Sequence, residues 1–286
     1  MSVNQLLSIV IGFLILSCSQ PNRESKSYQL KFKGSESMHG AFSALKKDFE
    51  KRQDTVKVFI EGGGSKTGLM AIKEGSADVG LSSYEFDLDS VLGSNHGVNQ
   101  KIVAYDGIVL ISHTDNPVLK LNNQQVAGIF SGRYTDWRQV GGYAGRIVPI
   151  VRDSNSGTQA FFTEYFKIEK VNPVAVVADE NKVIVTRVQE NQNAIGYIGF
   201  GYFTDSANSL EIAQKDEVDS QFVSATFKNL GSGMYPLKRS LRMYYRDHEN
   251  PALQAFMTYL QSQDAQLIIQ GQGLMPQSIN DNLASR

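Results

Sequence analysis

Three segments of this chain join a predicted strand to a predicted helix through a turn rich in Gly, Ser or Thr. The turns are Gly34-Ser35-Glu36-Ser37, Gly62-Gly63-Gly64-Ser65-Lys66-Thr67 and Arg152-Asp153-Ser154-Asn155-Ser156-Gly157-Thr158. Such a turn leaves free backbone N–H groups and hydroxyls at the positive end of a helix dipole. Three of them, one carrying an arginine, favour convergence on a single tetrahedral oxyanion.

The apolar pattern of the segment 28–82 alternates between strand spacing and helix spacing. It predicts strands at 28–33, 55–60 and 77–82, a helix at 41–51, and a second helix that follows the glycine turn and stops at Gly75. This βαβαβ order is typical of an α/β fold whose mostly parallel sheet carries helices on its faces. Because ligands of open α/β sheets bind outside the carboxyl ends of the strands, all three turns would lie at the binding edge.

The remaining elements predict a second lobe and a return to the first. A long apolar strand at 101–111, interrupted at Asp106-Gly107, is suited to leave one lobe and enter another. The pattern then predicts helices at 124–130, 158–166, 183–189 and 251–270, and strands at 145–151, 194–199 and 237–245. With two turns in the first lobe and one in the second, we expect the anion in a cleft between lobes that close about a hinge.

Composition and charge narrow the range of partners. The chain has 286 residues, of which 41% are hydrophobic and 20% charged, and these values are typical of a globular protein. Its formal net charge of −1 gives no electrostatic footprint for nucleic acid or for an anionic membrane surface. An anion site must therefore be local, built from oriented dipoles and one or two cations.

The sequence patterns that indicate catalysis, metals or cofactors are missing. The four histidines are scattered and form no metal-binding spacing. Ser156 lies outside the Gly-x-Ser-x-Gly pattern of a nucleophile elbow. Gly62 lies only four residues before Lys66 and Ser65 rather than a glycine precedes the lysine, so the second turn does not match the Gly-x-x-x-x-Gly-Lys spacing of a P-loop. We expect a binding protein with no metal, no cofactor and no enzymatic activity.

The N-terminal segment predicts export. An apolar stretch from Leu6 to Leu16 suits a signal peptide, and Ile15-Leu16-Ser17-Cys18 resembles a bacterial lipobox. We expect a signal peptide at 1–17, a lipidated Cys18 with a polar tether at 18–27, and anchoring in the bacterial cell envelope, periplasmic or surface-exposed, by acyl chains alone. The alternative is an ordinary secretory signal with an incidental cysteine, since no Lys or Arg precedes the apolar stretch.

The candidate anion ligands each have a simpler structural interpretation. Ser37 can donate its hydroxyl to an anion, or it can act only as a helix cap. Ser65 follows three glycines that allow close backbone approach, and the alternative is a flexible loop. Arg152, ahead of the Ser-Gly-Thr turn, is the most specific element, because a guanidinium on a strand end can meet two oxygens. Its alternative is a surface ion pair with Asp153.

In their order along the chain, these segments resemble the substrate-binding proteins of the phosphate-specific ABC transporter, which belong to the two-lobed periplasmic binding protein class. The resemblance rests on the three turns and on Asp78-Val79-Gly80-Leu81-Ser82-Ser83, Tyr105-Asp106-Gly107-Ile108, Ile129-Phe130-Ser131-Gly132, Trp137, Ala194-Ile195-Gly196-Tyr197 and Tyr235-Pro236-Leu237-Lys238-Arg239. It implies the type II fold of that class, with two α/β lobes joined by a two-strand hinge and a ligand cleft between them. The implied lobes are 28–107 plus 238–286, and 108–237.

The same resemblance implies a function and a set of ligands. The protein would capture inorganic phosphate between its lobes and deliver it, as a monomer, to the permease subunits of an ABC transporter. The implied phosphate-binding residues are Ser35, Glu36, Ser37, Gly64, Ser65, Ser83, Arg152, Ser156, Gly157 and Thr158. The alternatives are a binding protein for another tetrahedral oxyanion, such as sulfate or molybdate, and a secreted phosphatase.

One position departs from several members of that family, which place an aspartate where Ser83 stands here. A carboxylate at that position accepts the proton of hydrogen phosphate and repels fully ionised sulfate. A serine hydroxyl accepts a hydrogen bond but carries no charge to reject sulfate. We expect Glu36, Asp153 or Asp78 to supply the acceptor, and we favour Glu36 because it lies inside the first turn.

Overall fold

The computed structural model describes residues 27–215, 217, 220–247 and 250–277. The predicted signal peptide and Cys18 lie outside the described residues, as does nearly all of the predicted tether. None of the helices in the described ranges is long and apolar enough to cross a bilayer.

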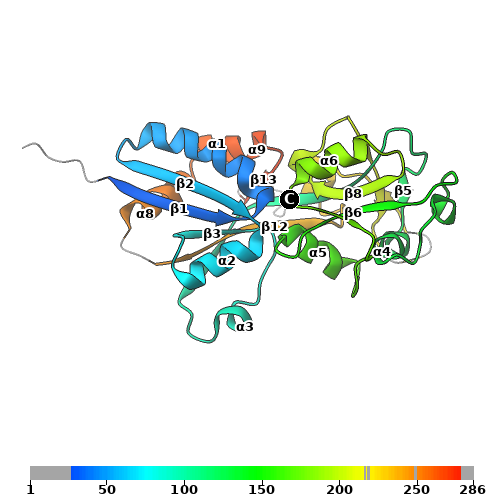
Figure 1. The fold of residues 1–286 in the computed structure, drawn as a ribbon. Helices are drawn as coiled ribbons and strands as arrows, with labels where there is room; N and C mark the ends of the chain where they lie inside the picture. The colour runs from blue at the N-terminus through cyan, green and yellow to red at the C-terminus, as the bar shows by residue number, and fades with distance from the viewer. Residues whose placement is uncertain (1–26, 216, 218–219, 248–249, 278–286) are drawn as a thin grey trace, which may run out of the picture.

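A mixed sheet runs through the molecule (Figure 1). Its strands are β1 (Tyr28–Gly34), β2 (Val56–Gly63), β3 (Val79–Ser82), β4 (Val98–Ser112), β6 (Val148–Arg152), β7 (Val176–Ala178), β8 (Ala194–Gly199), β9 (Asn208–Ser209), β12 (Lys238–Arg246) and β13 (Met275–Pro276). The order is β2-β1-β3-β12-β4-β8-β6-β7, and β9 and β13 also pair with β4. A small second sheet joins β5 (Lys120–Leu121), β10 (Glu211–Ala213) and β11 (Phe222–Val223).

Helices cover both halves of the main sheet (Figure 1). The half that holds β1, β2 and β3 carries α1 (Glu36–Arg52), α2 (Ser65–Glu74), α3 (Leu88–Leu92), α8 (Pro251–Tyr259) and α9 (Gln263–Gly271). The half that holds β6, β7 and β8 carries α4 (Asn123–Ser131), α5 (Gly157–Tyr165), α6 (Asn181–Gln189), α7 (Phe227–Gly231) and the 3-10 turns η1 (Trp137–Val140) and η2 (Phe200–Tyr202). We call these halves the first lobe and the second lobe.

Each lobe has its own buried apolar core. In the first lobe, Phe32 of β1 packs against Phe42 of α1 and Phe256 of α8, with ring centroids 5.7 and 4.9 Å away. In the second lobe, Phe162 of α5 stacks on Tyr197 of β8 at 3.8 Å. Met275 packs with the second-lobe cluster although the predicted bounds assign it to the first lobe. The predicted two-lobed α/β architecture is confirmed, while the residue bounds of the lobes stay a prediction.

The chain passes between the lobes in two antiparallel strands, β4 and β12. Gly107 of β4 pairs with Lys238 of β12, and from Ile108 onwards β4 pairs with β8 instead. The predicted interruption of this strand at Asp106-Gly107 is wrong, because β4 is continuous from Val98 to Ser112. A Cβ on Gly107 would lie 2.7 Å from Leu230 Cδ2, so the glycine lets β4 pass close to α7 rather than ending the strand.

The other predicted elements are found within a few residues of their expected bounds, with one exception. The helix expected at 251–270 is two helices, α8 and α9, which are separated by a short turn. Ser262 accepts a hydrogen bond from the Ala265 N–H at 3.3 Å, so its hydroxyl caps a new helix where the apolar spacing alone would continue the old one.

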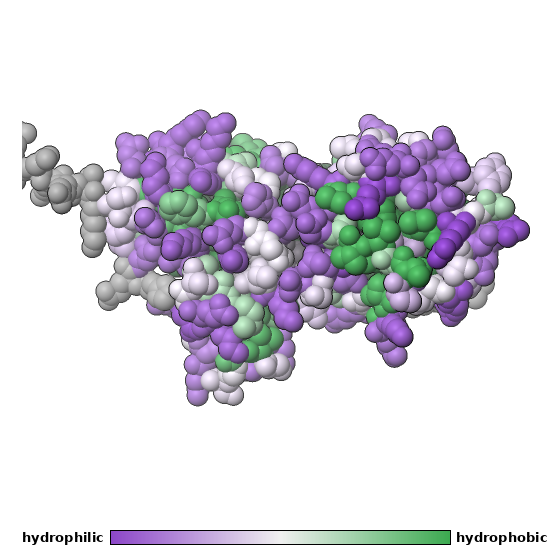
Figure 2. All heavy atoms as spheres, viewed as in Figure 1, coloured by the Kyte–Doolittle hydropathy of each residue, from purple (hydrophilic) through white to green (hydrophobic). Residues whose placement is uncertain are grey.

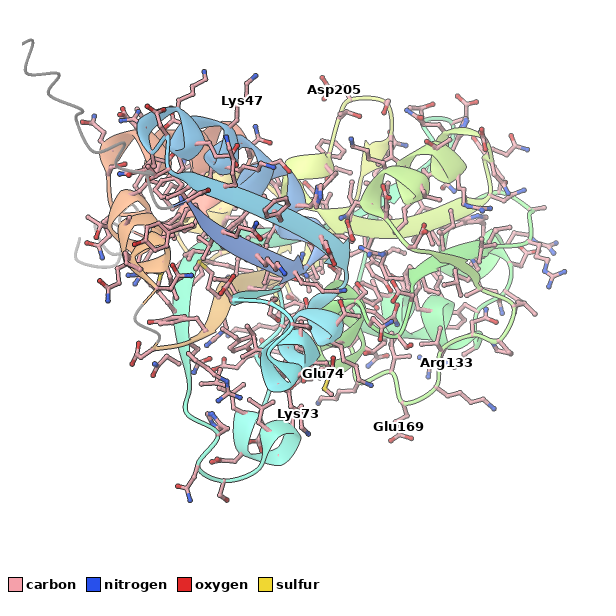
Figure 3. All side chains as sticks on the ribbon, turned by 60° about the vertical axis from the view of Figure 1, so that its left-hand side comes forward. Lys47, Lys73, Glu74, Arg133, Glu169 and Asp205 are labelled. Atoms are coloured by element: carbon pink, nitrogen blue, oxygen red, sulfur yellow. The ribbon has the colours of Figure 1, made fainter. Side chains whose placement is uncertain are left out.

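Hydrophilic side chains cover much of the face shown in Figure 2, with a large apolar patch over the strands of the second lobe and smaller ones on the first lobe. Figure 3 shows charged side chains of both signs pointing outward around the molecule, among them Lys47, Lys73, Glu74, Arg133, Glu169 and Asp205. Large buried polar groups gather instead near the point where the two lobes meet.

Candidate functional site

The first two turns pack against each other in the first lobe. Gly34 has φ +139°, and a Cβ on it would lie 2.2 Å from the Leu81 carbonyl oxygen, so only glycine allows this approach. The Ser35 N–H donates to that same oxygen at 2.9 Å, and the Gly64 N–H donates to the Gly34 oxygen at 3.0 Å. These contacts bring the starts of α1 and α2 to the carboxyl ends of β1 and β3.

Three serines form a buried hydroxyl cluster at this point. Ser35 Oγ donates to Ser83 Oγ at 3.0 Å, and Ser65 Oγ lies 3.3 Å from Ser83 Oγ. The Ser83 N–H donates to Ser65 Oγ at 3.0 Å. All three residues are at most 2% exposed. We call Ser35, Ser65 and Ser83 the serine cluster. It contains three of the predicted site residues.

The third turn brings the second lobe onto the serine cluster. Gly157 begins α5, and a Cβ on it would lie 2.2 Å from Ser65 Oγ and 2.8 Å from Ser83 Oγ. Glycine is therefore needed for α5 to approach this closely. Thr158 Oγ1 lies 3.1 Å from Ser37 Oγ, across the boundary between the lobes. Ser156 Oγ accepts from the Gln159 N–H at 3.3 Å and so caps α5.

Arg239 is the cation that touches both lobes at this site. Its Nη2 donates to Ser37 Oγ of the first lobe and its Nη1 to Thr158 Oγ1 of the second, each at 2.9 Å. Nη2 also forms an ion pair with Asp106 Oδ2 at 2.7 Å, and the two side chains are 2% and 1% exposed. Arg239 and Asp106 are opposite each other on β12 and β4. A buried guanidinium is thus fixed in the hinge between the two lobes.

Arg239 is a site residue that the sequence patterns do not single out. It lies far along the chain from the three turns, as the last residue of the Tyr-Pro-Leu-Lys-Arg run. The available signal was that this run begins the predicted return strand. A charged residue at the start of a strand that crosses the hinge faces the carboxyl ends of the first-lobe strands.

Arg152, the predicted cation, is buried but turned largely toward the second lobe. Its Nε donates to the Ala178 oxygen at 3.1 Å and its Nη2 donates to the Asp179 oxygen. Nη1 is buried and has no hydrogen-bond partner in the described part of the chain. Burial lowers the pKa of Arg152 below its usual value, yet a guanidinium stays charged at neutral pH. Nη1, which carries two N–H groups, is therefore a nitrogen of this side chain that can donate to an anion.

Other predicted ligands lie around this cluster. Gly64, at φ +93°, packs against Asn155 of the second lobe, whose oxygen accepts from the Lys66 N–H at 3.1 Å. Glu36 Oε1 accepts from the Gly63 N–H at 2.7 Å, which holds this carboxylate beside the second turn. The other two candidate acceptors also each accept one main-chain N–H: Asp78 Oδ2 from Lys31 at 2.7 Å, and Asp153 Oδ1 from Asn155 at 2.8 Å. Asp78 precedes β3 and so lies at the opposite end of that strand from Ser83.

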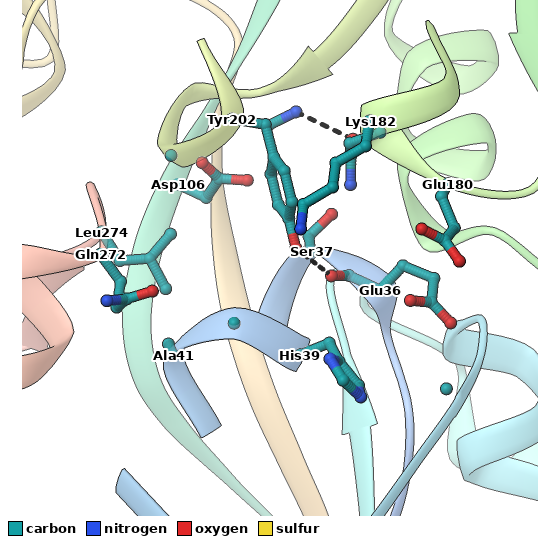
Figure 4. A pocket seen from close by; sticks show the side chains of 15 residues that line it. Glu36, Ser37, His39, Ala41, Asp106, Glu180, Lys182, Tyr202, Gln272 and Leu274 are labelled. Atoms are coloured by element: carbon teal, nitrogen blue, oxygen red, sulfur yellow. Dashed lines mark hydrogen bonds between the residues drawn. The ribbon is translucent and has the colours of Figure 1, made fainter. Parts of the chain in front are cut away.

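A cavity of about 530 Å³ opens beside Ser37 and Asp106 (Figure 4). Its walls come from both lobes, with Glu36 and His39 on α1 and Glu180 and Lys182 at the start of α6. The Tyr202 hydroxyl crosses between the lobes and donates to the Glu36 main-chain oxygen at 2.7 Å. Burial, with a smaller contribution from Glu36, raises the pKa of Tyr202 to about 12, so this hydroxyl remains a donor at neutral pH.

The chemistry of this region is that of an anion site. Hydroxyls, main-chain N–H groups at two helix starts and buried guanidinium groups all supply donors, and charge-assisted hydrogen bonds to them are strong where water is excluded. No group of three or more His, Cys, Asp or Glu side chains suited to a metal occurs within the described ranges. The arrangement can hold an oxyanion without a metal.

Comparisons with known proteins identify relatives of this chain. Residues 19–264 match a family model described as a PBP superfamily domain. The phosphate-binding protein PstS of Bacillus subtilis is 26% identical over 263 residues, which cover 91% of this chain and 84% of that protein. PstS of Pseudomonas aeruginosa is 27% identical over 264 residues, which cover 85% and 81%.

Solved structures show the same architecture. A phosphate ABC transporter substrate-binding protein of Clostridium perfringens, solved with bound phosphate, is similar with a TM-score of 0.77 and 29% identity, covering 87% of this chain and 99% of that chain. An ABC-type phosphate transport receptor from Vibrio cholerae has a TM-score of 0.72 with the same coverage and, at 24% identity, supports the fold alone.

Proposed function

We propose that this chain, which belongs to the PBP superfamily, captures inorganic phosphate between its two lobes and presents it to the permease of an ABC importer. The relatives named above are phosphate-binding proteins, and the similar Clostridium perfringens protein holds phosphate in its structure. The protein binds the ion and leaves it chemically unchanged, in contrast to a secreted phosphatase.

One observation carries the proposal: a single buried guanidinium, Arg239, contacts a first-lobe hydroxyl and a second-lobe hydroxyl at once. An anion that enters here meets donors from both lobes, so it stabilises the closed arrangement over the open one. The Ser37, Thr158 and Arg239 donors now bond one another, and phosphate would replace these contacts with stronger charge-assisted ones. The serine cluster, Arg152 Nη1 and the start of α5 complete the proposed shell.

The cell-envelope location is also part of the proposal. Substrate-binding proteins of importers work outside the inner membrane, and the lipobox-like segment ending at Cys18 would anchor this one by acyl chains. We propose that the protein acts as a monomer, since a two-lobed receptor encloses its ligand within one chain. Mass spectrometry of membrane-bound protein, with Cys18→Ser as the unanchored control, tests the lipid.

Calorimetric titration of the purified protein with phosphate tests the binding function. We expect one ion per chain, and we expect Ser37→Ala and Thr158→Val each to weaken binding at least tenfold, because each removes a hydroxyl that converges on Arg239. Ser131→Ala, a hydroxyl change on α4 away from the cleft, serves as the matched control. Absence of any heat with the wild-type protein at millimolar phosphate would reject the proposal.

Selectivity against sulfate depends on a carboxylate that accepts the proton of hydrogen phosphate. With a serine at position 83 in the buried cluster, we propose Glu36 for this role, since it lies in the first turn and lines the adjoining cavity. Titration with phosphate in excess sulfate checks this: wild type should keep its phosphate affinity, and Glu36→Gln should lose discrimination. Equal competition by sulfate in the wild type and in Glu36→Gln would show that Glu36 does not select phosphate over sulfate.

A further inference from the structure

The strands β1 and β2 leave one face of the first lobe without a helix. They pair in parallel, and parallel sheets usually carry helices on both faces. Here α1 and α8 cover one face, on which Leu30, Phe32, Val56 and Val58 are buried. The side of β1 and β2 that faces the viewer in Figure 1 carries none of the described helices. This second face is therefore open to a partner.

Lysines dominate the second face. Because side chains alternate along a strand and Lys31 pairs with Phe59, the exposed residues of β1 and β2 lie together on it. Lys33 Nζ lies 3.1 Å from Glu61 Oε2, and Lys46 Nζ lies 5.9 Å from the centre of the Phe59 ring. A groove of about 350 Å³ runs along this face. The lysine face comprises Lys31, Lys33, Lys46, Lys57, Phe59 and Glu61.

The charge and the apolar group of the lysine face suit an anionic lipid surface. Four lysines and one glutamate give it a net charge of +3, whereas the whole chain has −1. Asp78 lies at its edge, where Oδ2 accepts from the Lys31 N–H, and with Asp78 included the charge is still positive. Phe59 is 47% exposed among these lysines. Ammonium groups around an exposed aromatic ring can meet phosphate headgroups while the ring enters the interface.

The predicted lipid anchor ends close to the lysine face. Tyr28, the first residue of β1, follows Cys18 by ten residues. An extended chain spans at most ~3.5 Å per residue, so acyl chains on Cys18 would hold Tyr28 within about 35 Å of the bilayer. The net charge of the chain gives no long-range attraction to that bilayer. The lysines act at short range, within a Debye length of about 10 Å, once the anchor supplies a high local concentration.

We propose that the lysine face rests on an anionic phospholipid surface and so orients the anchored protein. The lysine ammonium groups meet the lipid phosphates, and Phe59 enters the interface between them. The first lobe is then held on the membrane, while the second lobe stays free to close about the hinge. This inference rests on the proposed lipid anchor at Cys18 and is independent of which anion the cleft takes.

Acrylamide quenching of a fluorophore tests the inference on the full-length protein in vesicles. The fluorophore is attached at Phe59→Cys, since a lipidated Cys18 has no free thiol. We expect quenching to be at least threefold weaker in vesicles that contain phosphatidylglycerol than in phosphatidylcholine alone. The protection should disappear in 1 M salt, where the Debye length is about 3 Å. Leu267→Cys is the matched reporter and should show no change, because α9 packs on the helix-covered side.

Charge variants test whether the lysines are responsible. The test variant combines Lys31→Gln, Lys46→Gln and Lys57→Gln. The control variant makes the same change in net charge at exposed lysines of the second lobe, and combines Lys120→Gln, Lys167→Gln and Lys170→Gln. We expect the test variant to lose the protection of the fluorophore and the control variant to keep it. Phosphate affinity should stay within twofold in both, because none of these lysines lies in the three turns of the anion site.

The outcomes separate this inference from the proposals it rests on. Equal quenching in the two kinds of vesicle overturns it, and so does an equal effect of the control variant. Protection in native membranes but not in protein-free vesicles assigns the face to a membrane protein and also overturns it. Labelling of the wild-type protein at Cys18 would show that the anchor is missing, which overturns the proposed location and this inference with it. Phosphate binding, measured by calorimetry, is unaffected by any of these results.

Discussion

At the scale of single residues, the Arg239–Asp106 pair links the hinge to the anion site. A buried ion pair contributes little net stability, but removing one partner leaves an uncompensated buried charge at a cost of about 3–5 kcal/mol. The Arg239–Asp106 contact is 2.7 Å long and almost fully buried. Arg239→Gln should therefore lower both the free energy of unfolding and the phosphate affinity, the latter at least a hundredfold.

A double variant separates these two effects. Arg239→Gln combined with Asp106→Asn removes both charges, so we expect denaturant unfolding to recover most of the lost stability while phosphate affinity stays low. Recovery of affinity in the double variant would show that Arg239 serves the hinge alone and does not hold the anion.

Gly157 offers a second residue-scale prediction. A Cβ here would overlap Ser65 Oγ at 2.2 Å, so Gly157→Ala should hold the lobes apart and weaken phosphate binding at least tenfold. The expected change in stability is small, because each lobe keeps its core. Gly271→Ala, where a Cβ meets nothing within 4 Å, is the control. Calorimetry gives the affinity, and unchanged binding in Gly157→Ala would argue against close approach of the lobes.

The turns of the site could be anticipated from sequence because each is local. Glycine, serine and threonine at the start of a helix indicate free donors wherever they occur, and Ser37 and Thr158 do lie together across the lobes. The orientation of Arg152 could not be anticipated, since it depends on the carbonyls of Ala178 and Asp179, which another strand brings alongside. The position of Arg239 could not be anticipated either, because it depends on the pairing of β12 with β4, which are far apart in the sequence.

At the scale of elements, apolar spacing predicted most strands and helices but not every boundary. The strands β1, β2 and β3 pair in parallel as expected. The prediction of one helix at 251–270 is wrong because the apolar residues keep helical spacing through the turn between α8 and α9. The interruption is marked only by Ser262, whose hydroxyl caps the start of α9. Short strands such as β9 and β13 are paired by tertiary contacts and leave no periodic signal.

Ser262 provides the prediction at this scale. Ser262→Ala removes the cap of α9 and should lower the free energy of unfolding by about 1 kcal/mol, measured in denaturant. Phosphate affinity should not change, because no residue of α9 lines the cavity beside Ser37. Thr258→Ala on α8 is a control, since its hydroxyl bonds only a carbonyl within its own helix. No loss of stability would mean that the Ser262 hydroxyl does not stabilise the start of α9.

At the scale of the whole molecule, the order of the motifs along the chain identifies the family better than any single motif does. The resemblance to two-lobed phosphate receptors is confirmed by the family match over residues 19–264 and by the similar structures. The size of the cleft was not foreseeable, since it depends on how far apart the starts of α1 and α6 lie once the lobes meet.

The hydrogen bond from Tyr202 to Glu36 joins the lobes at the mouth of the cleft. Tyr202→Phe should weaken phosphate binding about fivefold, which is the value of one neutral hydrogen bond. Burial raises the folded-state pKa of Tyr202 from 10.0 to about 12, so the contribution of this hydrogen bond is fully present below pH 10 and is lost as pH rises toward 12. Phosphate affinity of the wild type and of Tyr202→Phe, measured by calorimetry across this pH range, checks the expectation. An affinity ratio between the two proteins that changes with pH near neutrality would contradict it.

A crystal structure of the protein saturated with phosphate would show whether both lobes and the hinge hold the anion. We expect one ion within hydrogen-bond distance of Ser37 from the first lobe, Thr158 from the second and Arg239 from the hinge. An ion bound to one lobe only, or none at saturating phosphate, would contradict it.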